Sequence, residues 1–142
     1  MLNVAAGSGV AFLNNKFWNL ENIMTIPPGR KTNIRSELWA ILTAIKATAH
    51  MPDIPLVIKT DSKYSIDSIE KWFNKWTLNN FKLKGGKTIS NLDVLQSIII
   101  NKSNRDIKFR WIKGHSGYHF NELADQLAGR AMKIDYEMQC IL

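Results

Sequence analysis

Three acidic residues stand where a folded chain could present their carboxylates to metal ions. Glu37 lies near the start of one predicted helix, Asp61 directly follows a short apolar run, and Asp125 lies near the start of another predicted helix. Hydrolysis of a phosphodiester by two metal ions requires carboxylates around ions roughly 3.5–4 Å apart. Oxygen ligands of this kind favour Mg²⁺ or Mn²⁺ over zinc. The three residues therefore form a candidate site for two such ions.

Each of these acids also has a purely structural explanation. A carboxylate in the first turn of a helix interacts favourably with the helix dipole, by about 0.3–1 kcal/mol, which could account for Glu37 and Asp125. Asp61 could cap the segment that begins at Ser62. Taken singly, the residues leave both explanations open, so the surrounding sequence has to decide between them.

Alternating period-2 and period-3.6 patterns predict an α/β fold, a sheet covered by helices, in a single domain over residues 1–142. Residues 9–13 and 19–26 are expected to form a hairpin with a turn at Asn14-Asn15. Further strands are expected at Leu56–Thr60 and 107–112, with a flexible loop at 114–117. The predicted helices span residues 33–50, with Thr32 or Asn33 as the cap, and residues 64–73, 91–101 and 121–133.

The composition indicates a basic globular protein. Nineteen Lys and Arg against twelve acids give a net charge of +7, which would attract a polyanion. No apolar run approaches the roughly 18 residues of a membrane span, and the first residues lack the basic start of a secretory signal, so we expect a soluble protein. The single Cys140 cannot form an internal disulfide, which favours an intracellular, reducing compartment.

A Lys-rich segment at residues 71–87 concentrates this charge. It contains five lysines and no acid, interleaved with aromatic residues and the pair Gly85-Gly86. Trp72 and Trp76 are spaced i, i+4, which suits packing into the core as well as contact with a ligand. Lysines crowded on a protruding loop repel one another unless a negative partner meets them.

Several stretches in order resemble the ribonuclease H family, of the type that carries a basic protrusion, from Gly7 to Met132. They are GSGVAF, PGRKTNIRSEL, TDSKYSIDSI, the 71–87 protrusion with KTISNLD, and WIKGHSG followed by NELADQLA. An ordered series at matching spacing is far more specific than any single motif. The resemblance implies a mixed sheet flanked by helices and hydrolysis of the RNA strand of an RNA/DNA hybrid with two Mg²⁺ or Mn²⁺ ions.

The resemblance also implies roles for particular residues. Glu37, Asp61 and Asp125 match three of the family's four metal-binding carboxylates, and His115 matches its mobile histidine, which assists proton transfer or product release. Residues expected to contact nucleic acid are Arg30, Thr32 and Asn91 (a phosphate of the DNA strand), Asn33 (the minor groove), and Lys71, Trp72, Lys75, Trp76, Lys82, Lys84 and Lys87 (the protrusion). Ile34 departs from the pattern, because the family usually has an amide there.

The match breaks at its beginning. The family's central first strand, with its catalytic Asp followed by Gly, has no counterpart before Gly7, and the only acid before Glu37 is Glu21. Without that strand, hydrogen-bonding groups of the neighbouring strands would stay unpaired, at about 1–3 kcal/mol for each buried group. We therefore expect another segment to complete the sheet. The tail at 134–142, with Asp135 and Glu137, is one candidate, although it also fits a continued last helix.

Two classes of function remain open at this stage. The chain is expected to be an endoribonuclease acting on RNA/DNA hybrids, either as a fragment of an active enzyme or as a piece of a retroelement polyprotein. The alternative is an inactive module that binds hybrid or RNA through the same basic surface.

Overall fold

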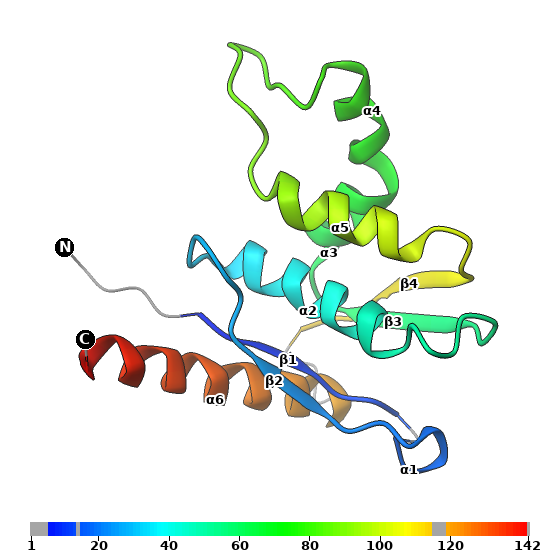
Figure 1. Cartoon of the computed structure of the whole chain (residues 1–142), viewed down its shortest axis with the longest axis vertical. Coiled ribbons are helices and arrows are strands. Elements are labelled where there is room, and N and C mark those ends of the chain that lie inside the picture. Colours follow the sequence, from blue (N-terminus) through cyan, green and yellow to red (C-terminus); the bar gives the residue numbers. More distant parts are fainter. Residues whose placement is uncertain (1–5, 14, 115–118, 142) are drawn as a thin grey trace.

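The computed structural model describes residues 6–13, 15–114 and 119–141 (Figure 1). Its elements follow the order β1 (Ser8–Val10), α1 (Asn15–Trp18), β2 (Ile23–Thr25), α2 (Asn33–Ala47), β3 (Leu56–Thr60), α3 (Lys63–Asp67), the π-helical turn η1 (Ser68–Trp72), α4 (Phe73–Leu78), α5 (Leu92–Lys102), β4 (Ile107–Trp111) and α6 (His119–Ile141). The predicted α/β class is confirmed, and β3 has the predicted bounds.

The first two strands form the predicted antiparallel pair, but the connection between them was predicted wrongly. The register places Gly9 opposite Met24. Instead of a tight turn at Asn14-Asn15, the chain forms the short helix α1 between the strands. Beyond the paired residues, the Phe12 backbone N–H donates to Asn22 Oδ1 at 2.9 Å, so a side chain replaces the strand ladder. The strands are consequently shorter than their alternating patterns suggested.

The described strands form two separate pairs. β1 pairs with β2 in one sheet, and β3 pairs in parallel with β4 in the other, with Ile58 opposite Phe109. No strand in the described ranges lies between β1 and β3. The sheet is therefore split at the place where the sequence resemblance indicated a missing central strand.

Helix α2 supplies more core residues than any other element and lies along both halves of the sheet. Thr32 caps its N-terminus, accepting a hydrogen bond from the Arg35 backbone N–H at 3.2 Å, as one of the two predicted caps. The helix ends at Ala47 instead of residue 50, because Thr48 closes it by donating to Ala44 O and Ile45 O. The buried core gathers Leu38, Ile41, Leu42 and Ile45 of α2 with Ile58, Ile69, Ile89, Val94, Leu95 and Ile98.

The segment after β3 extends away from the rest of the molecule (Figure 1). The helix predicted at residues 64–73 continues as α3, η1 and α4 as far as Leu78. A turn with positive φ at Gly85 and Gly86 and a single bridge between Lys82 and Thr88 bring the chain back to α5. The predicted basic protrusion is thus an arm built from a helix and a returning loop.

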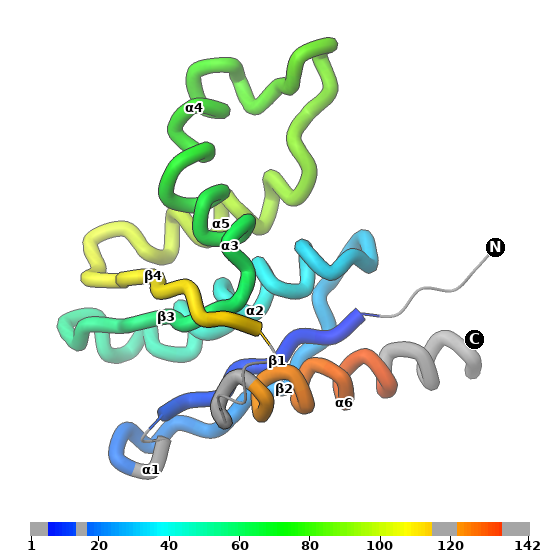
Figure 2. The backbone as a smooth tube through the Cα atoms, turned by 180° about the vertical axis from the view of Figure 1, so that it is seen from behind, coloured from blue at the N-terminus to red at the C-terminus, as the bar shows by residue number. Residues whose placement is uncertain are grey.

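Helix α6 runs along β1 and β2 on the side opposite α2, as both views show (Figures 1 and 2). It extends to Ile141, so residues 134–141 are helical instead of forming a surrogate strand, and the alternative of a continued helix is confirmed for them. Glycines allow the close approach: a Cβ at Gly9 would collide with the backbone of Ala124 and lie 2.7 Å from that of Ala128. No helix in the described part of the chain is long and apolar enough to cross a membrane.

This close approach predicts contrasting effects of two glycine substitutions. Gly9→Ala should lower the free energy of unfolding by about 1–3 kcal/mol, because the added methyl must push α6 away from β1. Gly129 lies in α6, and a Cβ added there would have no neighbouring atom within 4 Å. Gly129→Ala should therefore raise the free energy of unfolding by up to about 1 kcal/mol through helix propensity. Urea unfolding followed by circular dichroism measures both, and equal effects would contradict the packing described.

Candidate metal site and nucleic-acid interface

A cavity of about 330 Å³ lies between the two halves of the sheet. Its walls come from consecutive residues of the β1 and β3 regions and from α2 and α6. Glu37, Asp61 and Asp125 all line it. The fold therefore brings the three predicted carboxylates, which are far apart in sequence, to one cavity.

The structural explanations for these acids do not match their positions. Glu37 is the fifth residue of α2, beyond the first turn, where the dipole effect is concentrated. Asp125 lies in the second turn of α6, whose first-turn acid is Glu122. Ser62, not Asp61, caps α3, accepting from the Ser65 backbone N–H at 3.2 Å. Helix stability therefore does not explain these three residues.

The loop after β4 approaches the same site. A Cβ at Gly114 would lie 2.7 Å from Asp61 Oδ2, so only glycine fits there without displacing the carboxylate. The Trp111 indole N–H donates to Asp61 O at 3.0 Å and fixes the end of β3 from the neighbouring strand. His115 follows Gly114 directly but lies outside the described residues, so its predicted role remains a prediction.

The electrostatics of Glu37 reflect its crowded surroundings. Burial raises the pKa of its carboxyl, a hydrogen bond with Ser62 works against this shift, and the charges of Asp61 and Asp125 raise the pKa further. Carboxylate charges that disfavour ionisation of Glu37 also favour a bound cation, because the cation removes the repulsion. The charges of both other carboxylates therefore act on the ionisation of Glu37.

The chemistry of these donors fits a hard divalent cation, but their arrangement does not form a finished site. Among the residues that the structure describes, no three histidine, cysteine or acidic side chains are arranged to hold a metal ion. Asp125 is exposed, whereas Glu37 and Asp61 are half-buried. The carboxylates converge on one cavity, and an ion would have to draw them closer.

The predicted phosphate-binding residues lie around the starts of two helices. Arg30 is exposed in the loop before α2, Thr32 caps α2, and Asn33 is its exposed first residue. Asn91 precedes α5 in a left-handed conformation, with φ 62° and no side-chain capping bond.

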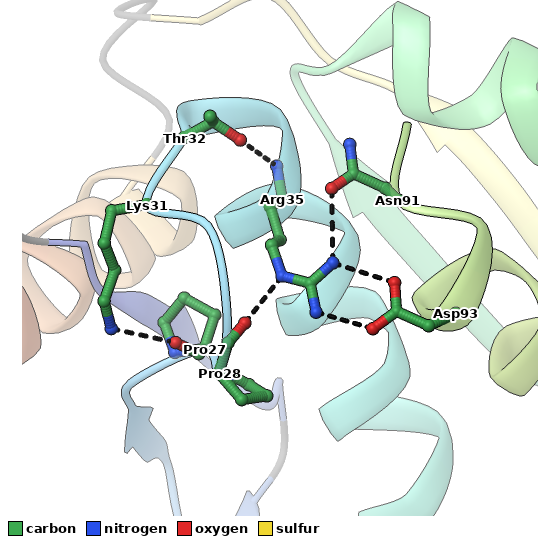
Figure 3. Close-up of polar contacts among 7 residues, drawn as sticks. All are labelled: Pro27, Pro28, Lys31, Thr32, Arg35, Asn91 and Asp93. Atoms are coloured by element: carbon green, nitrogen blue, oxygen red, sulfur yellow. Dashed lines mark hydrogen bonds and ion pairs between the residues drawn. The ribbon is translucent and has the colours of Figure 1, made fainter. Parts of the chain in front are cut away.

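Sequence reasoning missed the residue that joins these two helix starts. Arg35 is only 7% exposed and forms a two-pronged ion pair with Asp93 of α5, at 2.9 Å and 2.6 Å (Figure 3). It also donates to Pro28 O at 2.6 Å and to Asn91 Oδ1 at 3.4 Å. The pairing lowers the pKa of the Asp93 carboxyl, mainly through the hydrogen bonds from Arg35. The sequence did show a basic residue, Arg35, and an acidic residue, Asp93, each in the first turn of a helix. Their spacing alone did not indicate that they pair.

The arm exposes its five lysines, which are Lys71, Lys75, Lys82, Lys84 and Lys87. Two of them have partners: Lys71 lies 3.4 Å from Asp67, and Lys82 donates to Thr88 Oγ1 at 2.8 Å. Trp76 packs against the core although it is only partly buried, which is one of the two predicted alternatives. Trp72 lies edge-on to Tyr64 and tilted against Trp76, and its contact with a ligand stays a prediction.

Comparisons with known proteins agree with this architecture. The RNase H family model matches residues 3–133. A ribonuclease H of Tropheryma whipplei is 38% identical over 100 residues, covering 70% of this chain and 62% of the relative. A ribonuclease H of Schizosaccharomyces pombe is 36% identical over 125 residues, covering 88% of this chain and 45% of the relative. The chain thus spans about half to two thirds of these two relatives.

Solved structures show the same fold. LC9-RNase H1, a type 1 RNase H with the type 2 active-site motif, matches with a TM-score of 0.70 and 30% identity over 80% of this chain and 54% of that chain. The foamy viral protease-reverse transcriptase, in complex with RNA/DNA hybrid, matches with a TM-score of 0.67 and 21% identity over 93% of this chain and 21% of that chain. Together with the match to the family model, these similarities show that the chain belongs to the ribonuclease H family.

Proposed function

We propose that this protein hydrolyses the RNA strand of RNA/DNA hybrids with two divalent ions, Mg²⁺ or Mn²⁺. The proposal rests on the convergence of Glu37, Asp61 and Asp125 on one cavity, where burial and, to a smaller extent, the charges of the two aspartates raise the pKa of Glu37. These three side chains would hold the ions. Bound there, the ions would supply the Lewis-acid chemistry that activates water and stabilises the leaving oxygen.

The remaining residues would bind and orient the hybrid. Arg30, Thr32 and Asn91 would hold a phosphate of the DNA strand, and Asn33 would face the minor groove, where 2′-hydroxyls distinguish RNA from DNA. The lysines of the arm would follow the DNA backbone. His115, next to Gly114, would transfer a proton or assist product release.

A second candidate function is binding of hybrid without cleavage. The specific observation in its favour is that no three described acidic, histidine or cysteine side chains are arranged to hold an ion. Cleavage assays with Mg²⁺ and with Mn²⁺ separate the two functions, and tight binding of hybrid without any cleavage would favour the binding module.

Glu37→Gln should separate activity from stability. Loss of a metal ligand should reduce hybrid cleavage by more than about a hundredfold, since even the partners of metal ligands contribute 10–100-fold. Because the folded state raises the pKa of Glu37, its ionised form opposes folding at neutral pH. The substitution should therefore raise the free energy of unfolding at pH 7. This gain should disappear as the pH falls to where the carboxyl is protonated in both states.

The matched control is Asp53→Asn, which neutralises an exposed acid that does not itself line the cavity. It should leave cleavage unchanged. If Glu37→Gln cleaves hybrid as fast as the unsubstituted protein, the metal role of Glu37 is wrong.

The arm lysines should determine how binding responds to salt. Replacing Lys82, Lys84 and Lys87 with Ala should weaken hybrid binding, measured without divalent ions, and reduce the slope of log Kd against log salt by about one per lost phosphate contact. Replacing the exposed Lys46, Lys108 and Lys133 changes the net charge equally and should leave the slope nearly unchanged. Identical slopes for the two triple variants would contradict the role of the arm.

We further propose that an extended segment from the N-terminal side of Ser8 completes the sheet by lying between β1 and β3. Side chains alternate between the two faces of a strand, so a cavity on one face would be lined by every second residue. Residues 7–13 and 55–61 all line the cavity, which indicates that the edges of the strands face it. Leu56 N donates to Asp106 O and Ile112 N to Thr60 O, both at 2.9 Å. The neighbouring Val57 N–H therefore points toward the cavity side of β3.

The position of α2 gives the direction of this segment. β1 starts where Ser8 Oγ donates to Ser36 O at 2.6 Å, and β3 ends at Thr60, just before Asp61, whose charge acts on Glu37. Both points lie near the start of α2, so β1 and β3 run in opposite directions. A segment turning back before Ser8 would be antiparallel to β1 and parallel to β3. With helices on both faces, it should be apolar on both sides and about five residues long.

Adding such a segment to the N-terminus tests this proposal. An extension of β-branched residues should raise the melting temperature and slow hydrogen exchange at Val57, because it supplies the missing backbone partners. An extension of equal length containing prolines should do neither, since proline cannot donate to the ladder. Equal hydrogen exchange at Val57 in the two extended chains would refute the proposal. The proposal would also fail if the Val57 N–H of the unextended chain became protected as the protein concentration rises, because a second copy of the chain would then fill the space.

A further inference from the structure

The Arg35 guanidinium is a buried connector between three segments that carry the proposed phosphate-binding residues (Figure 3). It lies on the first turn of α2, three residues after the Thr32 cap. It reaches Pro28 O in the loop that continues to Arg30, and Asn91 and Asp93 at the start of α5. A change at Arg35 would therefore alter how these segments are held together.

Arg35 is poorly placed to bind a phosphate itself. Each of its three nitrogens already donates to Pro28, Asn91 or Asp93, and its side chain is 9% exposed. The Asp93 carboxylate also neutralises its charge at 2.6 Å. Its effect on a ligand must therefore pass through a neighbouring residue.

The contact with Asn91 fixes the orientation of an amide. A guanidinium has only donors, so the Asn91 atom that faces it must be the carbonyl oxygen. The distance from Arg35 to Asn91 Oδ1 is 3.4 Å, and the amide nitrogen points away from the guanidinium (Figure 3). An amide turned the other way would present its oxygen outward and repel an anion. The Asn91 backbone, at φ 62°, holds the side chain ahead of α5 without a capping bond.

We infer that Arg35 is a positioning residue, which orients the Asn91 amide so that its NH₂ group donates to a phosphate oxygen of the bound nucleic acid. This inference rests on the proposed function, because it takes Asn91 as a phosphate ligand. Asp93 keeps Arg35 in place by holding two of its nitrogens. Arg35 and Asp93 remain charged at neutral pH, since their pairing raises the pKa of the first and lowers that of the second.

A double-mutant cycle on hybrid binding without divalent ions tests the inference. Asn91→Ala should weaken binding about tenfold, the effect of losing one hydrogen bond to a charged group. Arg35→Lys keeps the charge but cannot span both Asp93 and Asn91, so it should weaken binding by a similar factor. The double variant should be no weaker than either single variant, because both remove the same interaction.

The salt dependence separates positioning from direct contact. Neither Asn91→Ala nor the charge-removing Arg35→Gln should change the slope of log Kd against log salt, because no cationic contact to phosphate is lost. A lower slope in Arg35→Gln would show that Arg35 meets the phosphate itself, and additive effects in the cycle would also overturn the inference.

Arg105→Lys is the matched control for a merely structural role. Arg105 likewise holds neighbouring segments from a partly buried position, donating to Ile45 O at 2.8 Å and Thr48 Oγ1 at 2.9 Å. Its substitution should lower the melting temperature without changing hybrid affinity. If Arg35→Lys and Arg105→Lys lower the melting temperature equally and leave affinity equally unchanged, Arg35 is only structural.

NMR spectra of the unsubstituted protein provide a test that does not depend on the folding of any variant. On titration with inorganic phosphate, the side-chain NH₂ signals of Asn91 should shift, while those of Gln96, exposed on the same helix, should not. Absence of a shift at Asn91, together with full affinity in Asn91→Ala, would remove Asn91 as a phosphate ligand and overturn this inference. The proposed metal site would be unaffected, because hybrid cleavage by Glu37→Gln tests it separately.

Discussion

The buried stripe of α2 is the interaction on which the rest of the structure depends. Leu38, Ile41, Leu42 and Ile45 are each at most 3% exposed and pack against α5 and β3, while the start of the same helix contacts β1 through Ser36. Full burial of each such side chain contributes about 1.5–3 kcal/mol. Since β1 and β3 do not pair, packing on this helix has to hold the two halves of the sheet beside each other.

The same arrangement explains why the carboxylates meet. Glu37 projects from α2 beside the gap, Asp61 ends the strand on one side, and Asp125 is placed on the other side by the close packing of α6 on Gly9. Burial raises the pKa of Glu37, and the charges of Asp61 and Asp125 raise it further, because carboxylates around the cavity repel one another. A divalent cation would relieve this repulsion, and a strand in the gap would make the surrounding backbone rigid. Under the proposed function, completion of the sheet would therefore also stabilise the metal site.

Much of this architecture could be predicted from local sequence signals. The apolar run of β3, the periodic stripe of α2 and the Thr32 cap are local features, and each was predicted within a few residues. The long β1–β2 connection was not predicted, because the helical turn at Asn15–Trp18 lacks a periodic pattern. The Arg35–Asp93 pair joins residues 58 positions apart, and the local patterns of a single sequence carry no signal for such a pairing. The three carboxylates were predicted to converge because the family resemblance supplied the long-range information that local patterns lack.

A titration with paramagnetic Mn²⁺ shows whether Glu37, Asp61 and Asp125 share divalent ions. Amide signals broaden when the ion binds within a short distance, so the backbone N–H of each residue reports on the site. If the three carboxylates share ions, the signals of residues 37, 61 and 125 should broaden together, at the same Mn²⁺ concentration, and excess Mg²⁺ should reverse the effect. Broadening of these signals at unrelated concentrations, or broadening confined to exposed acids such as Asp53 and Asp106, would contradict such sharing.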